Sequence, residues 1–176
     1  DRSPSRGLGD VYKRQLYTNS EKFAKLAKEK NKKLNELDKE TIENWKHIRE
    51  ASIKSMKEIL DTLNHEFDLW LGESSVNELI EPMLKSLKKE GKVDFDDGAL
   101  VSTQNTDPKI LITKSDGSYL YLTTDIATVL NRLEKNDFDT TLYVVDARQK
   151  LHFIQLFETI KYFDFPEREY KHIDFG

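Results

Sequence analysis

Hydrophobic residues recur at helical spacing over much of the first half of the chain. The period is weak from about residue 20 to residue 37 and clear after residue 40. Asp38 or Thr41 is placed to cap this second helix. One face of it would carry mainly apolar side chains: Trp45, Ile48, Ser52, Met56, Ile59, Leu60 and Leu63. We predict a helix with this apolar face.

The pattern then breaks, and shorter elements follow. Residues 67–71 indicate an extended segment. Ser75 and Glu78 have the spacing of a capping box, in which a hydroxyl and a carboxylate satisfy open amides at a helix start. Pro82 interrupts the pattern because proline lacks an amide donor and clashes with the preceding turn. We predict two short helices, with Pro82 near the first turn of the second and Gly91 as its terminator.

Beyond Gly91 the period of the hydrophobic residues shortens to that of strands. Apolar runs at 100–102, 110–113 and 118–122 predict strands, and Asp116-Gly117 is a strong hairpin signal between the last two. Thr123-Thr124-Asp125 then predicts a helix start, followed by a helix with one apolar face: Ile126, Val129, Leu130 and Leu133.

The end of the chain repeats the alternation of strand and helix. Residues 141–145 are rich in β-branched residues and predict a buried parallel strand. The apolar face of the next predicted helix consists of Leu151, Ile154, Phe157 (or Leu156), Ile160 and Phe163, and the last six residues predict another strand. The order strand–helix–strand–helix–strand indicates an α/β fold with a parallel sheet and right-handed crossovers.

Residues 1–15 differ from the rest of the chain. They contain two of the seven glycines and one of the four prolines, and they show neither a helical nor a strand period. The stretch also resembles a translated adaptor sequence. We therefore treat it as a non-native or disordered leader, predict no regular structure for it, and leave it out of the fold.

Composition narrows the class of protein without naming a function. The chain of 176 residues has 37% hydrophobic residues, 34% charged residues and no cysteine. It has neither a disulfide framework nor a thiolate metal site, and no apolar run approaches the roughly 20 residues that span a bilayer. The net charge of -4 argues against binding nucleic acid mainly through this surface, and we interpret the lysines of segment 22–33 as a solvated helix face. A cytoplasmic protein without membrane partners fits these numbers.

Polar residues follow two predicted strands at the edge where α/β sheets bind ligands. Tyr121 and Asp125 come at the first of these strand ends and Gln149 at the second. Asp125 could hold a cationic ligand, and the Gln149 amide suits the polar groups of an amino acid. Spacing alone favours plainer roles: a helix-start carboxylate, a core tyrosine and a solvent-facing glutamine. Asp146 and Arg148 could form a local ion pair, and the scattered histidines predict no metal site.

Several segments together resemble the arginyl-tRNA synthetase family. The segment at 119–127 (YLYLTTDIA), followed by Arg132-Leu133, is similar to the part of those enzymes after their connective insertion. The segment at 142–153 (LYVVDARQKLHF) is similar to their next strand and helix, and 172–176 (HIDFG) to the strand before their second nucleotide-binding signature. The resemblance is collinear from about residue 16 to residue 176, and its connective part includes three further segments: 68–74 (DLWLGES), 90–92 (EGK) and 97–100 (DGAL).

The resemblance implies an internal part of a class I aminoacyl-tRNA synthetase that activates L-arginine with ATP and Mg²⁺, without an organic cofactor, and transfers it to tRNA(Arg). Residues 16–98 would form a helical connective segment, and 99–176 the C-terminal half of a Rossmann-type catalytic domain with a partial parallel sheet. Tyr121 and Asp125 would hold the arginine side chain, and Gln149 would help to bind the amino acid. The resemblance marks no catalytic residue in this chain.

The departures from the family pattern leave other interpretations open. The His-x-Gly-His motif and the lysine-containing loop of the family lie outside this sequence, so we expect the 176-residue chain alone to be inactive in aminoacylation. One alternative is another class I aminoacyl-tRNA synthetase, against which a carboxylate suited to a cationic substrate argues. The other is a non-catalytic helical binding module fused to a degenerate α/β domain.

Overall fold

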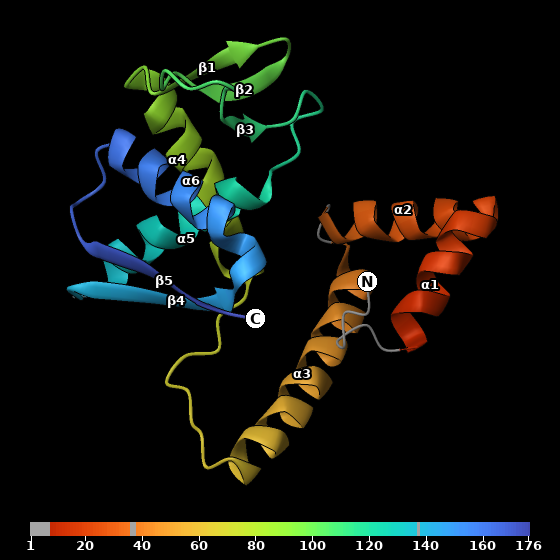
Figure 1. Cartoon of the computed structure of the whole chain (residues 1–176). Helices are drawn as coiled ribbons and strands as arrows, with labels where there is room; N and C mark the ends of the chain where they lie inside the picture. Colours follow the sequence, from red (N-terminus) through yellow and green to blue (C-terminus); the bar gives the residue numbers. More distant parts are fainter. Residues whose placement is uncertain (1–7, 36–37, 137) are drawn as a thin grey trace. The chain divides into compact units, whose positions relative to one another are not determined.

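The chain folds into two compact units, Asp1–Asp68 and Leu69–Gly176. The computed structural model (Figure 1) describes residues 8–35, 38–136 and 138–176. The predicted leader falls partly outside these ranges, at residues 1–7. From Leu8 the prediction of an irregular leader is wrong, because Leu8–Asn19 form helix α1.

Within the described residues, the regular elements of the first unit are all helices. Helix α1 is followed by α2 (Glu21–Asn35) and α3 (Lys39–Thr62). The predicted cap of α3 is confirmed: the backbone amide of Thr41 donates to Oδ1 of Asp38 at 3.0 Å. No described residue of α3 is buried, and Ile48 and Ile59 on its apolar face are exposed. Helical spacing was sufficient to predict the helix but could not show whether another element covers its apolar face.

The second unit begins with an irregular segment that leads into the 3₁₀ helix η1 (Glu73–Val76) and helix α4 (Asn77–Lys89). Ser75 lies inside η1, where its hydroxyl bonds to the Gly72 carbonyl at 2.7 Å, so the predicted capping box is not formed. Pro82 lies inside α4 rather than in a first turn. Helix α4 tolerates it because Pro82 and Glu78, whose carbonyl lacks its usual donor, are both on the exposed face. The opposite face is buried and consists of Ile80, Met83, Leu84 and Leu87.

A three-stranded antiparallel sheet follows α4, with the order β1 (Val93–Asp96), β2 (Ala99–Ser102) and β3 (Leu111–Thr113). The tight hairpin joins β1 to β2 through Asp97 and Gly98, both with positive φ (46° and 80°), as two-residue turns require. The hydrophobic pattern did not predict β1. The predicted returning strand at 118–122 is not formed, apart from one bridge between Thr113 and Tyr119.

The parallel sheet consists of two strands, β4 (Thr140–Asp146) and β5 (Glu169–Phe175). They are joined by the short 3₁₀ helix η2 (Ala147–Gln149) and helix α6 (Lys150–Tyr162). The prediction of a β-α-β unit is confirmed here, but β3 pairs with β2 in the antiparallel sheet instead of extending the parallel one. The structure is therefore a mixed α/β arrangement in which one sheet is antiparallel and a small one is parallel.

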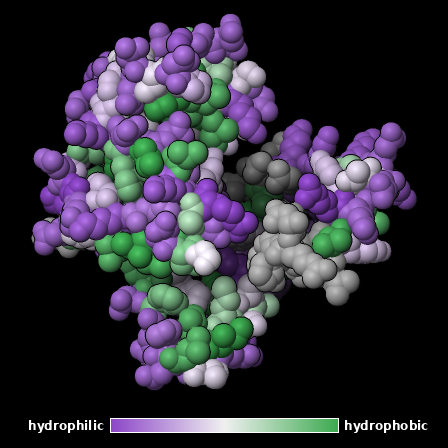
Figure 2. Space-filling model, in the orientation of Figure 1, coloured by the Kyte–Doolittle hydropathy of each residue, from purple (hydrophilic) through white to green (hydrophobic). Residues whose placement is uncertain are grey.

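Burial on the parallel sheet is one-sided, contrary to the prediction of a fully buried strand. Hydrophobic side chains gather over β4 and β5 on the molecular surface (Figure 2), and Val144 is 64% exposed. Tyr143 and Val145, on the other face, pack against the core. Within the described residues, helices cover one face of the pair only, which explains why alternate residues of a strand predicted to be buried on both faces remain at the surface.

The core of the second unit is formed by α4, α5 (Tyr121–Lys135), α6 and the first sheet. Helix α5 buries Ile126 and Val129 as predicted. Helix α6 buries Phe153 and Leu156, whereas the predicted face residue Leu151 is 81% exposed. Because α4 contributes to this core, residues 69–98 belong to the same compact unit as the α/β segment that follows them.

Lys92 links the start of β1 to the end of α6. Its ammonium group donates to the Tyr162 carbonyl at 2.7 Å and pairs with Asp164 at 2.5 Å, and it lies 4.8 Å from the centre of the Tyr162 ring. Asp164 has a positive φ of 56° just after the helix. The lysine side chain is only 21% exposed, so these contacts are partly shielded from water.

We expect Lys92→Met to lower the free energy of unfolding by about 1–2 kcal/mol, because it removes charge-assisted hydrogen bonds while keeping most of the apolar side chain. Urea unfolding followed by circular dichroism measures this change. The matched control is Lys109→Met, which removes an exposed lysine paired with Asp96 and should cost much less. Equal losses in the two variants would contradict a structural role for Lys92.

Candidate functional site

Tyr121 and Asp125 lie one helical turn apart on α5. We predicted Tyr121 in a strand and Asp125 in the first turn of the helix, and both placements are wrong: α5 begins at Tyr121, and its first turn contains no acidic residue. The position of both residues on α5 favours a shared site, because residues four apart lie on the same face of a helix. The plainer interpretation of Asp125 as a helix-start carboxylate no longer explains its position.

His152 of α6 joins these two residues into one cluster. Its Nε2 lies 2.6 Å from Oδ2 of Asp125, and both side chains are 19% exposed. The imidazole ring also packs against the Tyr121 ring, with 4.8 Å between the ring centres. We call these three residues the Tyr121–Asp125–His152 cluster. It connects two helices through the contact of Asp125 with His152, which lie 27 positions apart in the sequence.

The electrostatics of the cluster are set mainly by burial. Burial raises the pKa of Asp125 above its ordinary value, and the hydrogen bond and charge of His152 only partly oppose this increase. Burial also raises the pKa of Tyr121, helped by the negative charges of Asp125 and Glu73. A cation bound next to Asp125 would therefore stabilise its partly buried carboxylate. Tyr121, 51% exposed, presents part of its ring to solvent beside that carboxylate.

Gln149, the third predicted residue, is half-buried and is the N-cap residue of α6. It lies three residues before His152, at the end of η2, but within the described residues no hydrogen bond joins it to Tyr121 or Asp125. The predicted pair of Asp146 and Arg148 is confirmed, with N–O distances of 2.8 and 2.7 Å. Arg148 lowers the pKa of Asp146 to about 2, and Asp146 also caps η2.

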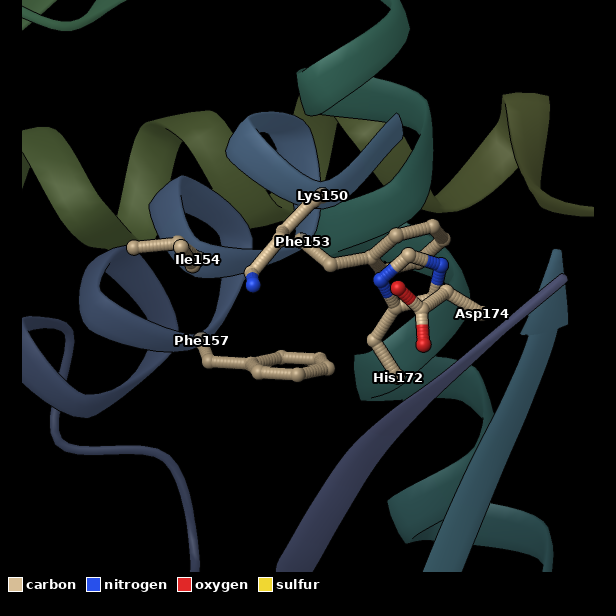
Figure 3. Close-up of a pocket in the computed structure, with 6 residues that line it drawn as sticks. All are labelled: Lys150, Phe153, Ile154, Phe157, His172 and Asp174. Atoms are coloured by element: carbon tan, nitrogen blue, oxygen red, sulfur yellow. The ribbon is translucent and has the colours of Figure 1, made fainter. Parts of the chain in front are cut away.

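A separate hollow of about 170 Å³ lies between α6 and β5. Figure 3 shows Lys150, Phe153, Ile154 and Phe157 from α6 and His172 and Asp174 from β5 around it. The His172 ring stacks on Phe153 at 4.8 Å. Tyr121, Asp125 and Gln149 are not among the residues that line this hollow, so it is distinct from the predicted site.

His152 is a member of the site that the sequence pattern did not predict. It follows Leu151 in a helical segment, where a lone histidine more often has a structural role, and no local spacing relates it to Asp125. Only the packing of α5 against α6 brings the two together. In the part of the chain that the structure describes, no group of three or more His, Cys, Asp or Glu side chains is arranged to hold a metal ion. Among the same residues, no helix has the length and apolarity needed to cross a membrane.

Comparison with known proteins gives the family. The model for "tRNA synthetases class I (R), catalytic domain" matches residues 2–176. The chain therefore belongs to this family, the catalytic domains of the class I (R) tRNA synthetases.

Curated relatives and one solved structure refine this placement. The chain is 42% identical over 123 residues to an arginine–tRNA ligase of Alkaliphilus oremlandii, covering 66% of this chain and 21% of that protein. It is 38% identical over 136 residues to an arginine–tRNA ligase of Francisella tularensis subsp. novicida, covering 75% of this chain and 23% of that protein.

The crystal structure of arginyl-tRNA synthetase from Plasmodium falciparum is similar with a TM-score of 0.77 and 26% identity, covering 92% of this chain and 29% of that one. The chain thus spans between a fifth and a third of the length of the proteins it matches.

Proposed function

We propose that this chain is the arginine-recognising part of an arginine–tRNA ligase, in which Tyr121 and Asp125 bind the guanidinium group. The observation that carries the proposal is the partly buried Asp125 carboxylate, held beside the Tyr121 phenol on one face of α5. A guanidinium is planar and always charged, so a carboxylate recognises it by geometry as well as by charge. A phenolic hydroxyl nearby would discriminate against side chains that leave it without a partner.

Gln149 supports the same proposal from the second strand end. It lies where η2 meets α6, directly beyond the carboxyl end of β4, which is the place where α/β folds bind ligands. An amide offers both a donor and an acceptor, which suits the polar groups around the α-carbon of an amino acid. We assign Gln149 to the main-chain end of arginine and the Tyr121–Asp125 pair to its side chain.

The rest of the reaction follows from the family and not from this chain's own residues. ATP, as its magnesium complex, would be the second substrate and tRNA(Arg) the acceptor, in the cytoplasm where translation takes place. In this proposal β4 and β5 are part of a larger Rossmann-type sheet, α6 is a helix that connects them, and residues 16–98 are the helical connective segment before it. The exposed apolar face of β4 and β5 is consistent with such a larger sheet.

The test is the amino-acid dependence of ATP–pyrophosphate exchange by the full-length protein that carries this segment, with tRNA present. Arginine should support exchange, while lysine, which is cationic but not planar, should support very little. The 176-residue chain alone should give no exchange above a buffer blank. Exchange that depends on a different amino acid would refute the assignment to arginine, and exchange by the isolated chain would refute the inactivity that we expect of it.

A further inference from the structure

We infer that His152 is a positioning residue of the arginine site: it holds one oxygen of Asp125 and fixes the ring of Tyr121, and so presents both to the guanidinium. This inference rests on the proposed function. Its basis is the 2.6 Å contact between His152 Nε2 and Asp125 Oδ2, together with the 4.8 Å ring contact to Tyr121.

The direction of the hydrogen bond follows from the chemistry of its partners. An ionised carboxylate can only accept, so Nε2 of His152 must carry the proton that it donates to Oδ2. Within the described residues, Oδ1 of Asp125 makes no hydrogen bond. His152 thus leaves one carboxylate oxygen for the N–H groups of the substrate and prevents the carboxylate from turning about its last bond.

The ring of His152 also supports the Tyr121 ring by packing. It packs against Tyr121 on one side and meets the Phe153 ring edge-on at 5.2 Å between centres. Tyr121 is half-exposed at the first position of α5, where its own helix gives it little lateral support. The imidazole therefore restricts the phenol ring in the same way as its Nε2–H restricts the carboxylate, and one side chain orders both groups that recognise the substrate.

Two substitutions separate the hydrogen bond from the ring contact. His152→Phe keeps an aromatic ring against Tyr121 but removes the donor to Asp125. His152→Gln keeps a terminal N–H donor but removes the ring. If the hydrogen bond positions the carboxylate, His152→Phe should raise the arginine KM about tenfold or more, because a hydrogen bond to a charged group is lost. His152→Gln should raise the arginine KM less, by about threefold, because the donor is kept and only the ring contact with Tyr121 is lost.

The experiment is steady-state ATP–pyrophosphate exchange by the full-length protein with tRNA present, varying arginine and ATP separately. We expect the kcat and the ATP KM of both variants to stay near their wild-type values, since His152 acts through Asp125. A purely structural role would instead lower kcat or the fraction of active enzyme in both variants and leave the arginine KM unchanged. Thermal melts identify any variant that does not fold; if His152→Phe fails, His152→Ala takes its place with the same expected result.

The outcomes distinguish the two proposals. An arginine KM that rises in His152→Phe and rises less in His152→Gln supports the positioning role. A wild-type arginine KM in the folded donor-less variant, or equal increases in both variants, overturns it while the arginine assignment stands. A wild-type protein without arginine-dependent exchange overturns the proposed function and this inference together.

Discussion

Replacing Asp125 by alanine in the full-length protein should raise the arginine KM by about a hundredfold or more, because removing one partner of a desolvated charge pair typically costs 2–5 kcal/mol. The guanidinium would then enter a partly buried site that contains no compensating carboxylate. The KM for ATP should change by no more than about twofold, since Asp125 is assigned to the amino-acid side chain only. Exchange assays at saturating ATP, with tRNA present, measure both values.

The stability of an Asp125 variant provides the control for this prediction. Burial raises the pKa of Asp125 above its unfolded value, so the site disfavours the ionised carboxylate. The stabilisation linked to this group is complete below the unfolded pKa and is lost as pH rises through the raised folded pKa. At neutral pH the ionised Asp125 is therefore a net cost, and Asp125→Asn should be at least as stable as the wild type. A wild-type arginine KM in a folded Asp125→Ala protein would contradict the assignment of Asp125.

The second large effect is expected in the core of the C-terminal unit. Leu156 on α6 is 0% exposed and belongs to the hydrophobic cluster formed by α4, α5 and α6. Leu156→Ala removes buried methyl groups and leaves a cavity, and such changes typically lower the free energy of unfolding by about 2–5 kcal/mol. Urea unfolding of the 176-residue chain, followed by circular dichroism, measures the loss.

Leu151 provides a matched control on the same helix. It is 81% exposed, so Leu151→Ala makes the same chemical change without opening a cavity and should alter the free energy of unfolding by no more than about 0.5 kcal/mol. The sequence pattern placed Leu151 on the buried face of this helix and left Leu156 as an alternative to Phe157. Equal losses for Leu151→Ala and Leu156→Ala would contradict the face that the structure assigns to α6.

Local pattern was enough to predict four elements of the C-terminal half. Helix α5, strand β4, helix α6 and strand β5 all lie close to their predicted positions, because each combines a period with clear end signals. Turn signals that competed with one another were harder to resolve. Two Asp-Gly pairs could each form a hairpin, and only the pair at Asp97-Gly98 joins strands that pair along their length.

Pairing partners and covered faces could not be predicted, because they depend on residues distant in the sequence. The pattern did not show that β3 pairs with β2 and not with the parallel strands, nor that α3 keeps its apolar face exposed. The candidate site shows the same limit. Tyr121 and Asp125 were proposed from a family resemblance, whereas the contact of Asp125 with His152 spans 27 positions and follows only from the packing of two helices.

In the proposed function, the charge of Asp125 selects the guanidinium of arginine. Citrulline tests it directly, because it has nearly the shape of arginine with a neutral urea in place of the cation. The measurement is the ratio of kcat/KM for arginine to that for citrulline in exchange by the full-length protein, for the wild type and for Asp125→Asn. We predict that the ratio falls by about a hundredfold or more in Asp125→Asn, mainly through arginine. An unchanged ratio in the folded variant would show that another group recognises the guanidinium and would contradict the role proposed for Asp125.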